Sequence, residues 1–171
     1  MRGIVGLVAG ALVLAAGSVW AMEHPAPKPV SAELERIKTL AGRWEGTGTG
    51  HEAGPVIVEY HVTSGGSAVV ETLSPGTEHE MVSVYHDRNG TLAMTHYCML
   101  GNQPELTLQE SGPGRLVLSL SPDSAIDAAH ETHMHALTLT WNGPNQLTQA
   151  WTAFEHGAAS ETSTFSFTRT Q

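Results

Sequence analysis

The feature that most constrains the fold is an alternation of apolar and polar residues with a period of two, which dominates the chain after residue 42. Side chains of a β-strand point alternately to opposite faces, so a strand buried on one face shows this period. Short sequences rich in Gly, Pro, Asn and Asp separate the alternating segments, as turns do. The pattern predicts ten strands, over residues 43–49, 56–63, 68–73, 79–86, 91–100, 105–110, 115–120, 133–141, 146–154 and 160–170.

The short connections between these segments determine the expected fold class. They contain no crossover helices, so neighbouring strands should pair antiparallel. We therefore expect an all-β protein, an antiparallel up-and-down barrel of about eight to ten strands, because a closed barrel leaves no exposed edge strand. One short helix is predicted within residues 31–42, capped by Ser31 and with Leu34, Ile37 and Leu40 on one face. We expect this helix to close one end of the barrel.

The N-terminal segment predicts export. Residues 1–21 combine a positive charge at Arg2, an apolar run and small residues before the expected cleavage point, which is typical of a signal peptide. Residues 22–30 contain three prolines and should form an extended linker. Residues 31–171 then form a single barrel domain, and we expect a periplasmic or secreted protein.

Charge and cysteine content limit the partners. The chain has 8 Lys and Arg against 17 Asp and Glu, for a formal net charge of −9. This balance argues against nucleic acid and anionic membranes as partners. Cys98 is the single cysteine, which rules out a disulfide within the chain. We expect a small molecule or a metal ion as ligand, no membrane association after signal cleavage, and a monomer or a weak homodimer.

Histidines and the cysteine occupy alternate positions on two predicted strands. His96 and Cys98 share their parity with apolar residues of the same strand, and so do His133 and His135. Both pairs should therefore face the barrel interior. The turn at residues 87–90, Asp-Arg-Asn-Gly, extends the set. If its loop has an even number of residues, odd positions before it share a face with even positions after it.

The resulting interior set suits a metal ion. Imidazole and thiolate groups bind zinc, and an added thioether suits copper(I). We predict a zinc or copper centre formed by some of these residues: His79, Met81, His96, Cys98, His133 and His135. The alternative is that they are buried core residues whose polar atoms are hydrogen-bonded within the protein.

Four more residues are predicted to contact a ligand at the wall or the mouth of the barrel: Tyr85, Asn102, Gln103 and Trp141. The sequence has no nucleophile elbow, phosphate-binding loop or dinucleotide motif, so a binding protein is favoured over an enzyme. Two alternatives remain open. One is a small enzyme that uses the histidine and cysteine cluster, and the other is a carrier of an apolar molecule in which the cluster is structural.

The two ends of the predicted barrel carry a recognisable pair of motifs. Gly42-Arg43-Trp44 opens the first strand, and Arg169 lies on the last. This pattern resembles the lipocalin-like (calycin) superfamily, in which a Gly-x-Trp on the first strand packs against a basic residue of the last. The segments GGSAVVETLSPGTEHEM and THYCMLGNQP are similar to those of exported bacterial lipocalin-like proteins. The resemblance implies a barrel in which Trp44 contacts Arg169.

A weaker likeness concerns haem. The glycine-rich string from Gly42 to Gly50 is similar to the opening of nitrobindin-type haem barrels. The last predicted strand, however, contains no histidine where those barrels place an axial ligand. Haem is therefore a less favoured cofactor than zinc or copper.

Overall fold

The computed structural model of the protein describes residues 29–50 and 53–170. The predicted signal peptide lies outside the described residues, as does most of the predicted linker. Val30, at the end of that linker, packs against the barrel core. No helix in the described part of the chain is long and apolar enough to cross a membrane.

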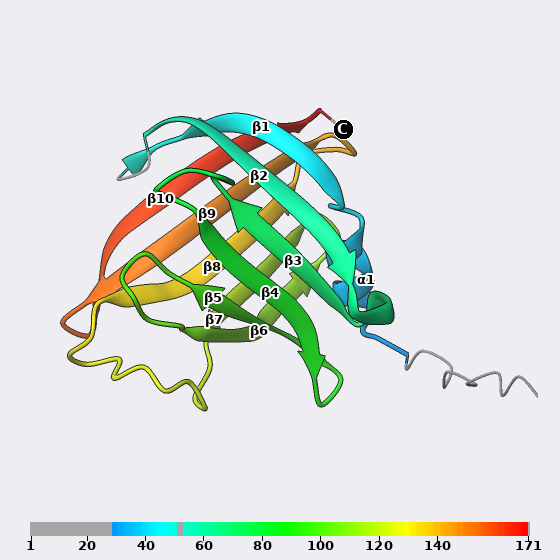
Figure 1. Ribbon diagram of the computed structural model, residues 1–171. Helices are drawn as coiled ribbons and strands as arrows, with labels where there is room; N and C mark the ends of the chain where they lie inside the picture. The colour runs from blue at the N-terminus through cyan, green and yellow to red at the C-terminus, as the bar shows by residue number, and fades with distance from the viewer. Residues whose placement is uncertain (1–28, 51–52, 171) are drawn as a thin grey trace, which may run out of the picture.

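Ten antiparallel strands form a closed up-and-down barrel, which confirms the predicted fold class (Figure 1). Each strand pairs with its neighbours in sequence, and the first and last strands pair with each other to close the barrel. The strands are β1 (Gly42–Gly48), β2 (Gly54–Thr63), β3 (Ala68–Leu73), β4 (Met81–Arg88), β5 (Thr91–Tyr97), β6 (Glu105–Gly112), β7 (Arg115–Leu120), β8 (His133–Trp141), β9 (Gln146–Glu155) and β10 (Ala158–Arg169), with a short 3-10 turn, η2 (Ser64–Gly66), between β2 and β3.

Two strand boundaries differ from the prediction in ways that affect the candidate site. Strand β4 begins at Met81, so His79 lies in the loop that precedes it. Strand β5 ends at Tyr97 because the chain turns immediately afterwards. The amide of Gly101 donates to the carbonyl of Cys98 at 2.9 Å, and Gly101 has a φ of 82°. His79 and Cys98 therefore lie just beyond strand ends rather than within strands.

The β4–β5 hairpin fixes which side chains share the interior. Arg88 pairs with Thr91, so the loop consists of Asn89 and Gly90 alone, and both have positive φ angles of 52° and 82°. This is the geometry that a two-residue hairpin loop requires. The loop is even, which meets the condition for the shared interior face, and His96 is the direct cross-strand partner of Ser83.

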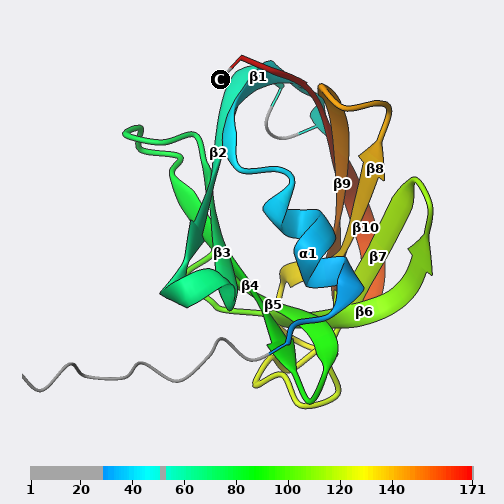
Figure 2. The ribbon, with the colours of Figure 1, turned by 90° about the vertical axis from the view of Figure 1, so that its right-hand side faces the viewer.

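Helix α1 (Ala32–Lys38) lies across one end of the barrel (Figure 2). The Ser31 hydroxyl accepts a hydrogen bond from the Leu34 amide at 3.0 Å and donates to Asp87 Oδ1 at 2.7 Å. The cap thus both begins the helix and ties it to the end of β4. Leu34 and Ile37 of α1 are fully buried against the interior. The prediction of a helix at the barrel end is confirmed.

Two cation–π contacts anchor the helix end of the barrel. The Arg169 guanidinium lies 4.1 Å from the centroid of the Trp44 ring, and that of Arg36 lies 4.1 Å from the centroid of the Trp141 ring. Arg169 also donates to the carbonyls of Thr39 and Ala41, both at 2.6 Å, which satisfies acceptors left open where the helix ends. The expected contact between Trp44 and Arg169 is present, and it holds α1, β1 and β10 together.

Candidate functional site: a cavity at the open end of the barrel

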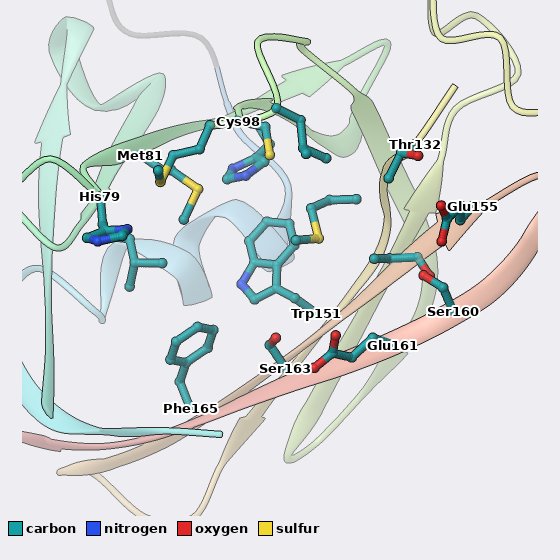
Figure 3. A pocket seen from close by; sticks show the side chains of 16 residues that line it. His79, Met81, Cys98, Thr132, Trp151, Glu155, Ser160, Glu161, Ser163 and Phe165 are labelled. Carbon is teal, nitrogen blue, oxygen red and sulfur yellow. The ribbon is translucent and has the colours of Figure 1, made fainter. Parts of the chain in front are cut away.

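A cavity of about 420 Å³ opens at the end of the barrel opposite α1 (Figure 3). Its volume falls within the range of typical small-molecule sites. The wall is mostly apolar, and one sector carries several polar groups. The lining residues are Leu73, His79, Met81, His96, Cys98, Met99, Leu100, Thr132, Met134, Trp151, Ala153, Glu155, Ser160, Glu161, Ser163 and Phe165.

His96 provides a buried polar group in the cavity wall. Its side chain is 3% exposed, its Nδ1 lies 3.0 Å from Ser83 Oγ, and its ring centroid lies 4.6 Å from that of Trp151. Burial lowers the pKa of His96 to about 4, so the ring is neutral at neutral pH. Within the described residues, its Nε2 makes no hydrogen bond. Nε2 can therefore bond to a molecule held in the cavity.

Two sulfur-bearing side chains and a second histidine lie near His96. Met81 begins β4 and is 7% exposed, and Cys98 is half-buried directly after β5. His79 is more exposed, and its Nε2 lies 3.7 Å from Glu78 Oε1. Figure 3 shows Met81, Cys98 and His79 on the same side of the cavity. The structure thus brings together four of the six predicted metal donors.

The opposite side of the cavity is acidic. Glu155 ends β9, and Glu161 and Ser163 lie on β10 (Figure 3). A Cβ on Gly50 would lie 2.7 Å from Glu161 Oε1 and 2.8 Å from Ser163 Oγ, so both oxygens lie close to the Gly50 backbone. A larger residue at position 50 would clash with these two side chains. Among the described residues, none that lines the cavity is a lysine or an arginine. The ionisable side chains among them are two glutamates, two histidines and the thiol.

A hydrogen-bonded network lies in the barrel interior below the cavity. The hydroxyl of Tyr85 donates to Glu71 Oε2 at 2.7 Å, and Gln149 Nε2 donates to the same oxygen at 3.1 Å. Gln149 also donates to the hydroxyl of Tyr60 and accepts from Trp151 Nε1 at 3.0 Å. Trp151 belongs to both the network and the cavity wall. The network therefore links the cavity to the centre of the barrel.

Burial raises the pKa of Glu71 to about 7, and hydrogen bonds from Tyr85, Tyr60 and Gln149 oppose that shift. Glu71 is 1% exposed, so its charged form loses almost all contact with water. Burial, together with the nearby Glu71, also raises the pKa values of Tyr60 and Tyr85 well above their usual range. These residues hold a polar layer in place and do not line the cavity.

His133 and His135 do not line the cavity, contrary to the prediction that both face the interior together with His96. A β-bulge interrupts β8 between Met134 and Ala136, so Met134 pairs with Ala153 and these two side chains line the cavity. The expected alternation is broken by this extra residue. His133 is nevertheless fully buried.

The histidine pair has its own set of contacts. His133 Nδ1 donates to the carbonyl of Glu131 at 2.7 Å, and its Nε2 lies 3.0 Å from His135 Nδ1. The His135 ring stacks on Phe154 with a centroid distance of 3.6 Å. Burial and the neighbouring His133 lower the pKa of His135. These contacts hold the start of β8 to the loop that precedes it.

The four residues predicted to contact a ligand also lie away from the cavity wall. Tyr85 belongs to the buried network, and Trp141 lies at the helix end beneath Arg36. Asn102 Nδ2 donates to Glu131 Oε1 at 2.8 Å and to the carbonyl of Thr132 at 2.9 Å, which joins two loops at the mouth. Gln103 is exposed and donates to the carbonyl of Gly101 at 3.1 Å. These four side chains therefore make contacts within the protein, some near the cavity and some at the helix end of the barrel.

The positions of the histidine, cysteine and methionine side chains limit which of them could form the predicted metal centre. In the described part of the chain, no group of three or more His, Cys, Asp or Glu side chains is arranged to hold a metal ion. Since His133 and His135 lie elsewhere, a zinc or copper site would depend on His79, Met81, His96 and Cys98. The metal centre stays a prediction.

Several residues of the site were not identified from the sequence. Glu71 and Gln149 each share strand parity with apolar neighbours, and a lone polar residue on an apolar face is a signal that could have found them. Trp151 and Phe165 could have been placed on the interior face in the same way. Glu155 and Glu161 flank a turn and are indistinguishable in sequence from ordinary surface residues.

Comparisons with known proteins do not assign the chain to a family. Neither a protein-family model nor a curated protein matches the sequence. Among solved structures, a redesigned β-barrel matches with a TM-score of 0.36 and 12% sequence identity, over 79% of this chain and 95% of that chain.

Proposed function

We propose that the protein binds a small, largely apolar molecule in the cavity at the open end of its barrel. The observation that carries this proposal is the cavity itself, about 420 Å³ in volume and lined mainly by apolar side chains, with His96 buried in its wall. Removing apolar ligand surface from water provides about 25 cal/mol for each Å². A polar atom of the ligand would bond to His96 Nε2, which has no partner within the described residues.

The barrel also suits binding because the site is already formed. Trp151 and Phe165 come from adjacent paired strands, and the Trp151 indole is fixed by its bond to Gln149. A preformed wall lowers the entropic cost of binding, since few side chains have to be ordered by the ligand.

The proposal includes an exported, lipocalin-like protein. It is supported by the contact between Trp44 and Arg169 and by the helix that closes the end of the barrel. The signal-like sequence of residues 1–21 supports export to the periplasm or the medium.

Filling the cavity tests the proposal. Ala153 lines the cavity on β9, so Ala153→Phe should weaken binding of a neutral apolar dye such as Nile red about tenfold or more, by taking up the ligand's space. Ala150→Phe is the matched control, since Ala150 lies on the same strand with opposite parity and should leave the affinity unchanged. Dye fluorescence titrations measure both affinities, and melting curves show that each variant is folded. Equal affinities for Ala153→Phe and the unchanged protein would contradict the proposal.

A copper(I) or zinc site is the second candidate, favoured by the shared position of Met81, His96, Cys98 and His79 on one cavity. Stoichiometric metal binding that Cys98→Ser abolishes, measured by competition with a chromophoric chelator, would support it over the apolar ligand. An enzyme would use the same residues, and turnover of a bound molecule that is lost in His96→Gln would support that alternative.

A further inference from the structure

We propose that the ligand of this cavity is an uncharged molecule with an apolar body and a carbonyl oxygen, and that this oxygen accepts a hydrogen bond from His96 Nε2. The inference rests on the proposed function and specifies the class of molecule bound. It is carried by the hydrogen bond between Ser83 and His96 and by the position of the His96 ring in the cavity wall.

Ser83 determines which nitrogen of the His96 ring carries the proton. Ser83 Oγ lies 3.0 Å from His96 Nδ1, and Ser83 is 1% exposed. Within the described residues, this hydroxyl makes no other hydrogen bond. A buried donor that is left without an acceptor costs about 1 to 3 kcal/mol. The Ser83 hydroxyl therefore donates to Nδ1, which accepts.

The proton of the His96 imidazole then lies on Nε2. A neutral imidazole carries one proton, so the nitrogen opposite an accepting Nδ1 is the donor. Burial lowers the pKa of His96 to about 4, which keeps the ring neutral at neutral pH. Both nitrogens of a protonated ring are donors as well. His96 Nε2 is thus an N–H donor in either state.

The His96 ring is held in place with this donor open to the cavity. It packs against Trp151 at a centroid distance of 4.6 Å, and Trp151 Nε1 donates to Gln149 Oε1 at 3.0 Å. The fully buried polar atoms that lack a partner in the described residues belong to Asn102 and Trp141. His96 Nε2 also lacks a partner there but is not one of these atoms, so it is accessible from the cavity that His96 lines.

A carbonyl oxygen is the group that fits this donor best. Its lone pairs accept from an N–H group, whereas an ammonium group has no lone pair and would leave Nε2 unpaired. A carboxylate also accepts, but no lysine or arginine among the described residues lines the cavity to compensate its charge. Burying an uncompensated carboxylate is strongly unfavourable. The site therefore favours an uncharged apolar ketone, aldehyde or ester.

Two naphthalene probes of the same shape test the inference by competition with Nile red. One is 2-acetylnaphthalene, which has a carbonyl oxygen, and the other is 2-isopropenylnaphthalene, which has a methylene group in its place. His96→Phe keeps an aromatic ring beside Trp151 but removes the donor. The affinity for 2-acetylnaphthalene should fall about fivefold in this variant, while that for 2-isopropenylnaphthalene should not fall. A charged probe, 2-naphthoate, should bind the unchanged protein at least about tenfold more weakly than 2-acetylnaphthalene.

His79→Phe is the matched control, because it makes the same substitution at another histidine of the cavity wall. It should leave the ratio of the two affinities unchanged. Infrared spectra of bound 2-acetylnaphthalene provide a direct readout, since a hydrogen bond weakens the carbonyl bond. The carbonyl band should lie at a lower wavenumber in the unchanged protein and in His79→Phe than in His96→Phe. If His96→Phe does not fold, Ser83→Ala/His96→Phe replaces it, because that variant leaves no buried hydroxyl unpaired.

Nitrogen-15 NMR of the histidine-labelled protein tests the tautomer without any substitution, and we expect the proton on His96 Nε2. A proton on Nδ1, equal effects of His96→Phe on both uncharged probes, or tightest binding of 2-naphthoate would each contradict the carbonyl inference and leave the binding function intact. If neither Nile red nor any naphthalene probe binds, the proposed function and this inference both fail.

Discussion

Among the individual residues, Glu71 and His96 have opposite effects on stability as the pH changes. The pKa of Glu71 is raised to about 7, so its contribution to stability is complete below its usual pKa and is lost as the pH rises through 7. The pKa of His96 is lowered to about 4, so its contribution is complete above its usual pKa and is lost as the pH falls through 4. Between these usual values, 4.5 for Glu71 and 6.5 for His96, the two slopes cancel.

Replacing the Glu71 carboxyl should remove one of these two opposing pH dependences of stability. Glu71→Gln keeps acceptor capacity for Tyr85 and Gln149 but has no proton to lose. We expect the free energy of unfolding of the variant, relative to the unchanged protein, to rise by about 3 kcal/mol as the pH increases from 4.5 to 8. Urea unfolding at four pH values across this range measures the difference.

The control for this change is an exposed carboxyl. Glu110→Gln alters a glutamate that is largely accessible to water, so its effect should vary little over the same range. A difference between Glu71→Gln and the unchanged protein that stays constant with pH would show that Glu71 titrates normally in the folded state.

At the scale of single elements, closure between β1 and β10 depends on one glycine. A Cβ on Gly46 would lie 1.9 Å from the carbonyl oxygen of Ser166 and 2.9 Å from Phe167 Cα, both of them backbone atoms that cannot turn aside. Gly46→Ala should therefore separate the two strands and reduce the free energy of unfolding by about 3 kcal/mol. Chemical denaturation gives this value.

Gly112 provides the matched comparison within a strand. A Cβ there would meet only the Arg115 carbonyl oxygen, at 3.9 Å, which is an ordinary contact. Gly112→Ala should change the free energy of unfolding by less than about 0.5 kcal/mol. Similar losses in the two variants would mean that the close approach at Gly46 is relaxed by movement of the strands.

The elements also show what the sequence could and could not predict. The turn at residues 87–90 was predicted from its residue types, and the two-residue loop Asn89-Gly90 meets the condition of an even loop on which the shared face depended. The bulge near His135 was missed because His133, Met134 and His135 alternate like an ordinary strand. A bulge depends on how a strand pairs with its neighbour, so the residue types of His133, Met134 and His135 alone do not predict it.

The residues of the site that depend on tertiary structure were likewise not predicted. His96, Cys98 and Met81 were expected inside the barrel, and they line the cavity. Glu155 and Glu161 were not expected there, because only the closed topology brings the β9–β10 turn to the same rim as the end of β5.

At the scale of the whole molecule, Arg169 joins the helix to the closure of the barrel. Its guanidinium contacts Trp44 and donates to two carbonyls at the end of the helix. Arg169→Ala should lower the free energy of unfolding by about 2 to 4 kcal/mol, since it removes a cation–π contact and two charged hydrogen bonds. Thermal and urea denaturation measure the loss.

Another arginine distinguishes this role from a general effect of removing charge. Arg115 forms an exposed pair with Glu110, and Arg115→Ala should cost less than about 1 kcal/mol. An equally small loss in Arg169→Ala would indicate that the helix is held by its buried leucine and isoleucine side chains alone.

If the protein binds a ligand as proposed, the helix across the end of the barrel would also determine how bound molecules exchange. Contacts of Arg36 and Arg169 hold α1 across that end, so a ligand would both enter and leave through the mouth. A competitor would then bind only after the first ligand has dissociated, and the exchange rate would not depend on the competitor's concentration.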